Sequence, residues 1–243
     1  MAAIFRSPQV GSSVTAGPTT RRRLLTASLP LLATVAFGLV FVAHRPTYLW
    51  LVEEDNLVEF ATSFVYLCAL AVALVVARRR AAVGDRLGAV AYVCLVLGFF
   101  FIAGEEVSWF QRQLGFAGPD ALVERNIQNE ANLHNLIGRH ALHAVYIAVG
   151  LWGLGLGRVL VRTIPFARPA WLFAPAARRW TWFFPVTGYY LYIDYAGPLL
   201  VRLFGPALRD LADGPARFQE PMELLLACGF ALFVLDALRR ATR

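Results

Sequence analysis

The feature that most constrains this chain is a series of apolar blocks, each long enough to cross a lipid bilayer. About 20 apolar residues in a helix span a hydrocarbon core of roughly 30 Å. Hydrophobic residues make up 58% of the 243 residues, and they gather in blocks at 24–43, 57–77, 87–104, 136–157, 180–204 and 218–238. Because lipid offers the backbone no hydrogen-bond partner, a spanning segment must satisfy its own polar groups, as a helix does. The sequence therefore predicts an all-α, polytopic membrane bundle of about six transmembrane helices.

The basic residues predict how such a bundle is oriented. All 23 of them are arginine, and groups of them lie at residues 21–23, 78–86, 158–179 and 239–243. Cytoplasmic loops are enriched in basic residues, so we expect both termini in the cytoplasm, with residues 1–23 as a disordered tail and 24–243 as a single transmembrane domain. The net charge of +7 does not indicate a nucleic-acid partner, because the arginines lie at block ends and form no patch with interleaved aromatic residues. The expected partner is the lipid bilayer.

Most acidic residues fall on the opposite side of this predicted bundle. Asp194 lies within a block, 14 residues after Trp180, hence about 21 Å along a helix and beyond the midplane. A charge within a span is costly and is a functional candidate by default, so we expect Asp194 to be functional. Glu220 and Glu223 have a simpler explanation at the start of the last block, because acids and proline are favoured in the first turn of a helix.

The stretch GEEVSWFQR places two adjacent carboxylates, Glu105 and Glu106, at the end of the third block. On a continuing helix Glu105, Ser108 and Arg112 are spaced i, i+3 and i+7 and share a face, whereas Glu106 points about 100° away. We therefore expect one glutamate to serve a polar site and the other to meet a neighbouring helix. The chain at about 111–135 is then a polar re-entrant or surface segment.

The stretch NIQNEANLHN precedes the fourth block. Its polar residues alternate, as on one face of a strand, but Asn126, Glu130 and His134 also recur at i, i+4 and i+8 and form one stripe of a helix. We prefer the helix because the stretch leads directly into a span, and Glu130 and His134 then present a carboxylate and an imidazole to one point. His140 and His143 share a face farther along, and we expect them to be helix-contact residues.

Together the two motifs resemble a pattern, EExSWxQR followed by NxQxExxLHN, of bacterial multi-pass membrane proteins for which we know no established activity. The resemblance covers roughly residues 50–145, and Phe110 stands where that pattern often has a small residue such as glycine. It implies location in a bacterial inner membrane. It also implies a single constellation of Glu105, Glu106, Ser108, Trp109, Gln111, Arg112, Asn126, Gln128, Glu130, His134 and Asn135.

These residues suggest a metal-dependent hydrolase or transferase. Carboxylates with an imidazole suit Zn²⁺, Mg²⁺, Mn²⁺ or non-haem iron, and a metal-activated water attacks esters and phosphodiesters such as those of a lipid or lipid-linked substrate. The predicted metal ligands are Glu105, Glu106, Glu130 and His134. The predicted catalytic residues are Glu105, Glu106, Ser108, Glu130 and Asp194. The predicted substrate-binding residues are Gln111, Arg112, Asn126, Gln128 and Asn135.

Two other functions fit the same pattern. In a small proton-coupled transporter, Asp194 and Glu59 would be the titrating groups, although the short chain without an internal repeat argues against it. In a non-catalytic scaffold or assembly factor, the acids would pair with arginines, and amide side chains would bridge the helices. The oligomeric state is left open by the sequence.

Overall fold

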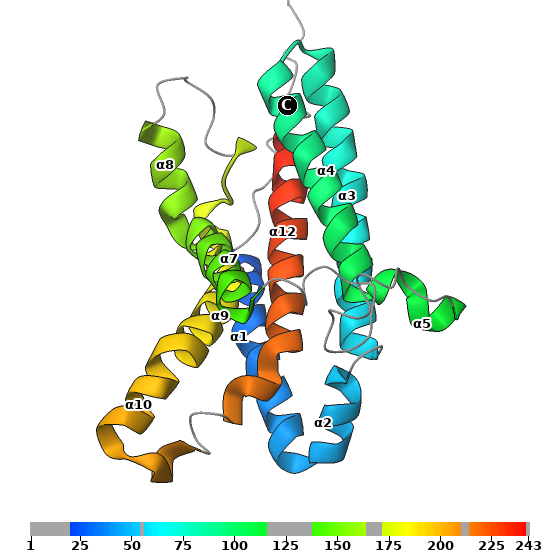
Figure 1. The fold of residues 1–243 in the computed structure, drawn as a ribbon. Helices are drawn as coiled ribbons and strands as arrows, with labels where there is room; N and C mark the ends of the chain where they lie inside the picture. Colours follow the sequence, from blue (N-terminus) through cyan, green and yellow to red (C-terminus); the bar gives the residue numbers. More distant parts are fainter. Residues whose placement is uncertain (1–19, 54–55, 116–137, 164–171, 210–213, 242–243) are drawn as a thin grey trace, which may run out of the picture.

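The structure is a computed structural model, and it describes residues 20–53, 56–115, 138–163, 172–209 and 214–241 (Figure 1). Within these ranges it contains helices and no strand, which confirms the predicted all-α class. Of the expected tail at 1–23, residues 1–19 lie outside the described ranges, and residues 20–23 belong to the first helix. The helices are α1 (Thr20–Ala43), α2 (Arg45–Val52), α3 (Leu57–Ala82), α4 (Arg86–Glu106), α5 (Gln111–Leu114), α7 (Arg139–Leu151), α8 (Gly157–Thr163), α9 (Trp180–Leu191), α10 (Gly197–Phe204) and α12 (Gln219–Ala241).

Five segments in the described ranges are long and apolar enough to cross a membrane. The difference from the predicted six lies in the block at 180–204. That block is divided into α9, a π-helical turn η6 (Tyr192–Ala196) and α10, and neither helix alone reaches spanning length. The five segments are Leu25–Ala43, Arg45–Ala82, Arg86–Glu106, Arg139–Thr163 and Gln219–Ala241.

Helix α12 lies at the centre of the bundle, beside the hairpin of α3 and α4 and in contact with α9 (Figure 1). Ala69, Ala73 and Ala77 recur every fourth residue along α3, and all three are buried. Small side chains at this spacing let neighbouring helices approach closely. These alanines belong to one hydrophobic core cluster. On the α9 side of α12, Phe183 and Tyr190 are fully buried in a second core cluster.

Helices α7 and α9 pack so closely that there is no room for a side chain at the glycines between them. A Cβ atom at Gly150 would collide with the hydroxyl of Thr187, and one at Gly153 would collide with the ring of Phe183. Gly150 in α7 and Gly153 in the π-helical turn η3 (Trp152–Leu156), which follows α7, therefore allow this part of the chain to lie directly on α9. The close approach brings the polar side chains of α7 and α9 together.

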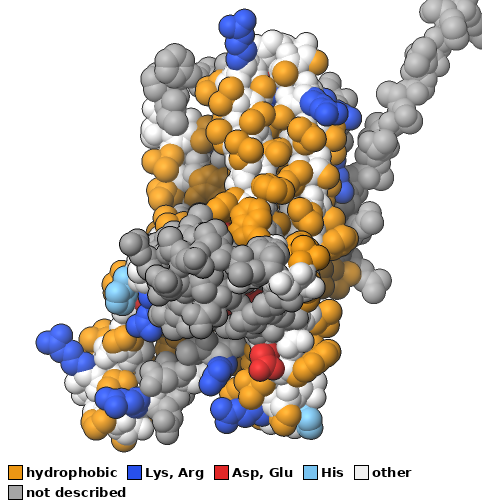
Figure 2. Space-filling view, turned by 45° about the vertical axis from the view of Figure 1, so that its right-hand side comes forward, with side chains coloured by type: hydrophobic (Ala, Val, Ile, Leu, Met, Phe, Trp, Pro, Cys, Tyr) orange, Lys and Arg blue, Asp and Glu red, His pale blue; other side chains and the backbone are white. Residues whose placement is uncertain are grey.

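The outside of the bundle is strongly apolar. Leu39, Phe64 and Leu97 are 65%, 67% and 63% exposed. Figure 2 shows hydrophobic side chains over much of the upper part of one face, with basic side chains above and below them. Soluble monomers rarely expose apolar surface on this scale, whereas a membrane-facing surface requires it.

One end of the bundle is rich in arginine. The turn between α3 and α4, helix α8 and the end of α12 all lie there (Figure 1). The buried carboxylate of Asp236 accepts hydrogen bonds of 3.0 Å from Nε and Nη2 of Arg179, and Nη2 of Arg178 lies 2.8 Å away. In the α3–α4 turn, Nε of Arg80 donates to Asp85 at 2.8 Å. These contacts fix the arginine-rich end.

Candidate functional site

The turn after α4 has an unusual backbone. Ser108, Trp109 and Phe110 have φ values of 45°, 55° and 60°. These lie in the left-handed region, which is unfavourable for residues with a Cβ atom. Such outliers persist only where the surrounding structure holds them, and they cluster at functional sites. Phe110, at the position where the resembling pattern often has glycine, is one of the three.

This turn corrects the prediction that Glu105, Ser108 and Arg112 share a helical face. Helix α4 ends at Glu106, and the chain then reverses its hand before α5 begins. Ser108 is buried in the turn. The side chain of Arg112 is not among those described, so its predicted role stays a prediction.

Glu105 faces the turn. The residue is 5% exposed, and its carboxylate accepts a 2.6 Å hydrogen bond from Nε1 of Trp109. The indole ring folds back over α4, where it lies 5.7 Å from the ring of Phe100 and leaves no space for a Cβ atom at Gly104. Glu105 therefore positions the left-handed turn, and the structure separates it from Glu106.

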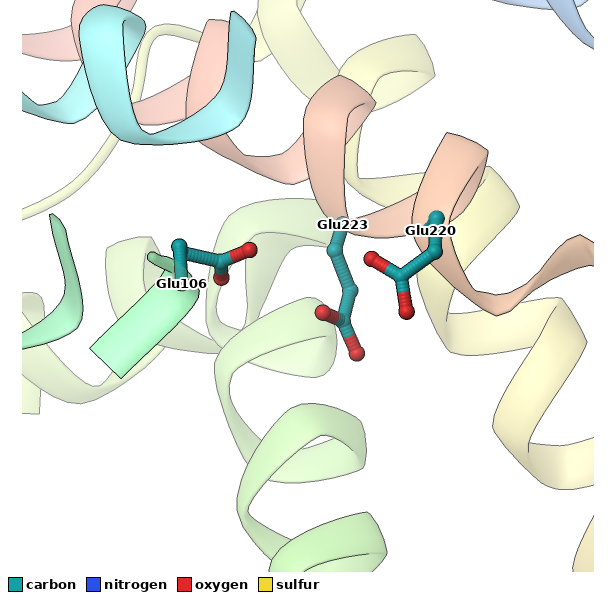
Figure 3. A group of neighbouring side chains, drawn as sticks. All are labelled: Glu106, Glu220 and Glu223. Carbon is teal, nitrogen blue, oxygen red and sulfur yellow. The ribbon is translucent and has the colours of Figure 1, made fainter. Parts of the chain in front are cut away.

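Glu106 points toward the start of α12, where it meets Glu220 and Glu223 (Figure 3). We call these three residues the acidic cluster. One carboxylate oxygen of each lies within 4.8 Å of the others, Glu223 is 6% exposed, and the other two are half-buried. Glu59, in the first turn of α3, adds further negative charge near Glu106. Carboxylates gathered in this way must be protonated, hydrogen-bonded or bound to a cation.

Two tyrosines support the acidic cluster from α7 and α9. The hydroxyl of Tyr190 donates a 2.6 Å hydrogen bond to Oε1 of Glu223. Tyr146 stacks on Tyr190, with ring centroids 4.6 Å apart and planes at 10°, and its side chain also hydrogen-bonds to Glu223. These contacts fix the position of one carboxylate of the cluster.

A histidine and an aspartate with nearly buried side chains lie next to the tyrosines. Nδ1 of His143 is 2.7 Å from Oδ1 of Asp194, and the two side chains are 7% and 8% exposed. Asp194 belongs to the π-helical turn η6, a type of distortion often found at functional sites. The ring of His143 lies 4.7 Å from that of Tyr190. Asp194, His143, Tyr190 and Glu223 therefore form a contiguous series that ends at the acidic cluster.

The structure brings together only part of the predicted constellation. Glu106 joins the acidic cluster, Glu105 turns to Trp109, and Asp194 pairs with His143. Gln111 begins the short helix α5. Five predicted residues lie outside the described ranges, namely Asn126, Gln128, Glu130, His134 and Asn135.

Sequence reasoning assigned no site role to Glu220, Glu223, His143 and Tyr190. The two glutamates were explained as helix-start acids, which they are, since Glu220 lies in the first turn of α12. One signal was present, because their i, i+3 spacing places both on one face, on the side of the membrane predicted for Glu106. His143 gave no signal for pairing with a residue 51 positions away.

No protein-family model matches this chain, and no curated protein or solved structure matches it either. The resemblance to bacterial multi-pass membrane proteins therefore rests on the motif residues alone.

Proposed function

We propose that this chain is an integral protein of the bacterial inner membrane that binds a divalent cation at the acidic cluster and acts there on a lipid-like substrate. The observation that carries the proposal is the meeting of three carboxylates from α4 and α12, with one oxygen of each within 4.8 Å of the others. Like charges at this distance repel one another unless a proton or a cation lies among them. A divalent cation offsets the most charge with a single ion.

The distribution of charge along α12 supports a position near the outer membrane boundary. Glu220 and Glu223 begin this helix of 23 residues, and Arg239 and Arg240 lie in its last turn. A helix of this length extends about 34 Å, which matches a bilayer core. If the arginine-rich end is cytoplasmic, as basic residues favour, the acidic cluster faces the outer leaflet. Both termini are then cytoplasmic when α9, η6 and α10 cross the membrane together as a sixth span.

The ligand atoms of the acidic cluster favour a hard cation. Carboxylate oxygens suit Mg²⁺ and Mn²⁺. Zn²⁺ or Fe²⁺ would gain from an imidazole ligand such as that of His134, which lies outside the described ranges. A bound divalent cation polarises a phosphate or ester oxygen and activates water, which is the chemistry that a lipid hydrolase or transferase needs.

Side chains of the protein hold one carboxylate of the acidic cluster in place and provide a base. Tyr190 fixes Glu223 through its 2.6 Å hydrogen bond. Asp194, at 2.7 Å from Nδ1 of His143, favours the tautomer that keeps the proton on that nitrogen and leaves Nε2 basic. His143 is therefore the proton acceptor that we assign to the reaction, with Asp194 as the residue that orients it.

A proton-coupled carrier is the second candidate. The buried His143–Asp194 pair favours it, because paired acids and imidazoles within membrane segments are typical of proton relays. In such a carrier, protons rather than a metal ion would neutralise the acidic cluster.

Manganese binding tests the main proposal. The full chain, purified in detergent without added chelator, is titrated with Mn²⁺ and followed by electron paramagnetic resonance. We expect about one Mn²⁺ per chain, competition by Mg²⁺, and loss of binding in Glu106→Gln and Glu223→Gln. Glu53→Gln is the matched control, because this exposed acid lies at the same end of the bundle and outside the acidic cluster.

Three outcomes separate the candidates. Mn²⁺ binding that depends on Glu106 and Glu223 supports the metal site. Folded wild-type protein that binds neither Mn²⁺ nor Mg²⁺ overturns it. Proton flux into liposomes that is lost in Asp194→Asn would then indicate the carrier, and the absence of both metal binding and flux would indicate a scaffold.

A further inference from the structure

A cavity of about 540 Å³ lies between α2 and the segment that leads into α12. Its volume falls within the range of pockets that hold small molecules, roughly 300–1,000 Å³. The wall combines apolar side chains with charges of both signs, and it includes Leu49, Trp50, Glu53, Arg217, Gln219 and Glu220.

The two walls of the cavity are tied together by Tyr48. Its side chain is fully buried, and its hydroxyl donates a 2.6 Å hydrogen bond to the backbone carbonyl of Arg217. Its ring lies 5.2 Å from that of Phe218 and 5.1 Å from that of Phe41. A wall held in this way needs little ordering when a ligand binds, which favours affinity.

The cavity lies at the end of the bundle opposite the α3–α4 turn, since α2 and the start of α12 are both there (Figure 1). In the proposed orientation this is the outer membrane boundary, where phospholipid head groups lie. Trp50 is 56% exposed on the wall, and tryptophan is enriched at that depth in membrane proteins.

We infer that this cavity binds the head group of a phospholipid that carries both a phosphate and a primary ammonium, the phosphatidylethanolamine class. A guanidinium such as that of Arg217 matches phosphate oxygens in a bidentate geometry. The carboxylates of Glu53 and Glu220 attract an ammonium, and the ring of Trp50 adds a cation–π contact. Leu49 and Trp50 offer apolar surface to the glycerol and upper acyl carbons.

The same wall disfavours other common head groups. Phosphatidylglycerol has a phosphate without an ammonium, so Glu53 and Glu220 would face a ligand of their own sign. Phosphatidylcholine has an ammonium without N–H groups, so it cannot donate hydrogen bonds to either carboxylate. We therefore expect the cavity to bind phosphatidylethanolamine more tightly than phosphatidylglycerol or phosphatidylcholine.

Glu220 belongs both to the cavity and to the acidic cluster, so a bound head group lies next to the proposed cation site. The assignment of this phospholipid as the substrate rests on the proposed function. Binding of the head group does not, because neither Arg217 nor Glu53 belongs to the acidic cluster.

The test measures lipid binding with the metal site emptied. Delipidated full-length protein in maltoside detergent with EDTA is titrated calorimetrically with dihexanoyl phosphatidylethanolamine, phosphatidylcholine and phosphatidylglycerol, and with soluble phosphoethanolamine. We expect the ethanolamine lipid to bind about tenfold more tightly than the other three ligands. Arg217→Gln should weaken its binding about tenfold, as expected when charge-assisted hydrogen bonds are lost.

Two further variants sharpen the test. Glu53→Gln should weaken binding of the ethanolamine lipid and strengthen that of phosphatidylglycerol, because it removes the like charge. Arg202→Gln is the control, since this exposed arginine of α10 lies outside the cavity and should change nothing. If Arg217→Gln fails to fold, Arg217→Lys replaces it and should bind the lipid with reduced affinity.

Equal affinity for the three lipids in wild-type protein overturns the inference, as does unchanged binding in a folded Arg217 variant. Phosphoethanolamine that binds as tightly as the lipid would overturn the lipid assignment in favour of a soluble ligand. Mn²⁺ resonance on the same samples without EDTA reports the acidic cluster separately, so failure of one site is distinguishable from failure of the other.

Discussion

The hydroxyl of Tyr190 donates a 2.6 Å hydrogen bond to Oε1 of Glu223. Tyr190 has no exposed surface and Glu223 is 6% exposed, so water cannot readily replace either partner. The contact joins α9 to α12 beside the end of α4. It therefore couples the packing of these helices to the geometry of the acidic cluster.

Tyr190→Phe should lower the free energy of unfolding by about 1–3 kcal/mol, because it removes a short hydrogen bond to a buried carboxylate and leaves that carboxylate with fewer donors. Unfolding of the purified protein in detergent, followed by circular dichroism, measures the change. Tyr195→Phe serves as the control, since Tyr195 is 64% exposed and should stay within about 0.5 kcal/mol of wild type. Equal stability of the two variants would show that the hydrogen bond contributes nothing net.

His143 and Asp194 should show energetic coupling. Their side chains are nearly buried and meet at 2.7 Å, so removing either leaves a buried polar group behind. We expect the effects of His143→Ala and Asp194→Asn to be non-additive by about 1–3 kcal/mol in a double-mutant cycle. His140 lies 3.9 Å from the same carboxylate with its side chain 82% exposed, and the corresponding cycle with His140→Ala should give a much smaller coupling. Additive effects at His143 would contradict the pair.

Arg179 should be the most important arginine for stability. It pairs with Asp236 through two hydrogen bonds of 3.0 Å, and both residues are buried. Arg179→Ala should destabilise the protein by about 1.5–3 kcal/mol, because the buried Asp236 loses two charge-assisted hydrogen bonds and keeps only the half-exposed Arg178 as a close partner. Arg239→Ala is the matched control, since that side chain is 71% exposed and lies 3.9 Å from Asp236. A thermal unfolding series in detergent that ranks the two variants equally would argue against this role of Arg179.

The long helices were predictable because the length of an apolar block alone determines whether it can span a bilayer. The division of the block at 180–204 was not predicted, although Asp194 lies within η6 and Gly197 and Pro198 begin α10. A π-helical turn depends on how α9 packs against its neighbours, and a single sequence does not reveal that packing.

Only one member of the acidic cluster, Glu106, could be predicted as a site residue from the sequence. Glu106 follows an apolar span and has no simpler explanation, so it was identified. Glu220 and Glu223 fit the start of any helix, and this adequate local explanation concealed their contact with Glu106. Contacts between residues more than 100 positions apart, such as Glu106 and Glu220, need the fold itself.

Cysteine labelling tests the predicted orientation. After Cys68, Cys94 and Cys228 are replaced, a single cysteine is introduced at Glu53 or at Arg162, which lie at opposite ends of the bundle. We expect an impermeant thiol reagent to label the first position in intact cells, because the acid-rich end faces outward if the arginine-rich end is cytoplasmic. The second position should react only after the membrane is permeabilised. The reverse pattern would invert the topology and place the acidic cluster toward the cytoplasm.

The left-handed turn after α4 offers a test of stored backbone strain. Phe110 has a φ of 60° and is 46% exposed. Its ring therefore contributes little buried surface, whereas its Cβ atom is unfavourable in this backbone conformation. Phe110→Gly and Phe110→Ala remove the same ring, but only glycine also relieves the backbone. The glycine variant should therefore be more stable than the alanine variant by about 1 kcal/mol in the same unfolding measurement. An alanine variant as stable as the glycine variant would mean that residue 110 leaves the left-handed conformation in solution, and the position of Trp109 against Glu105 would then need another explanation.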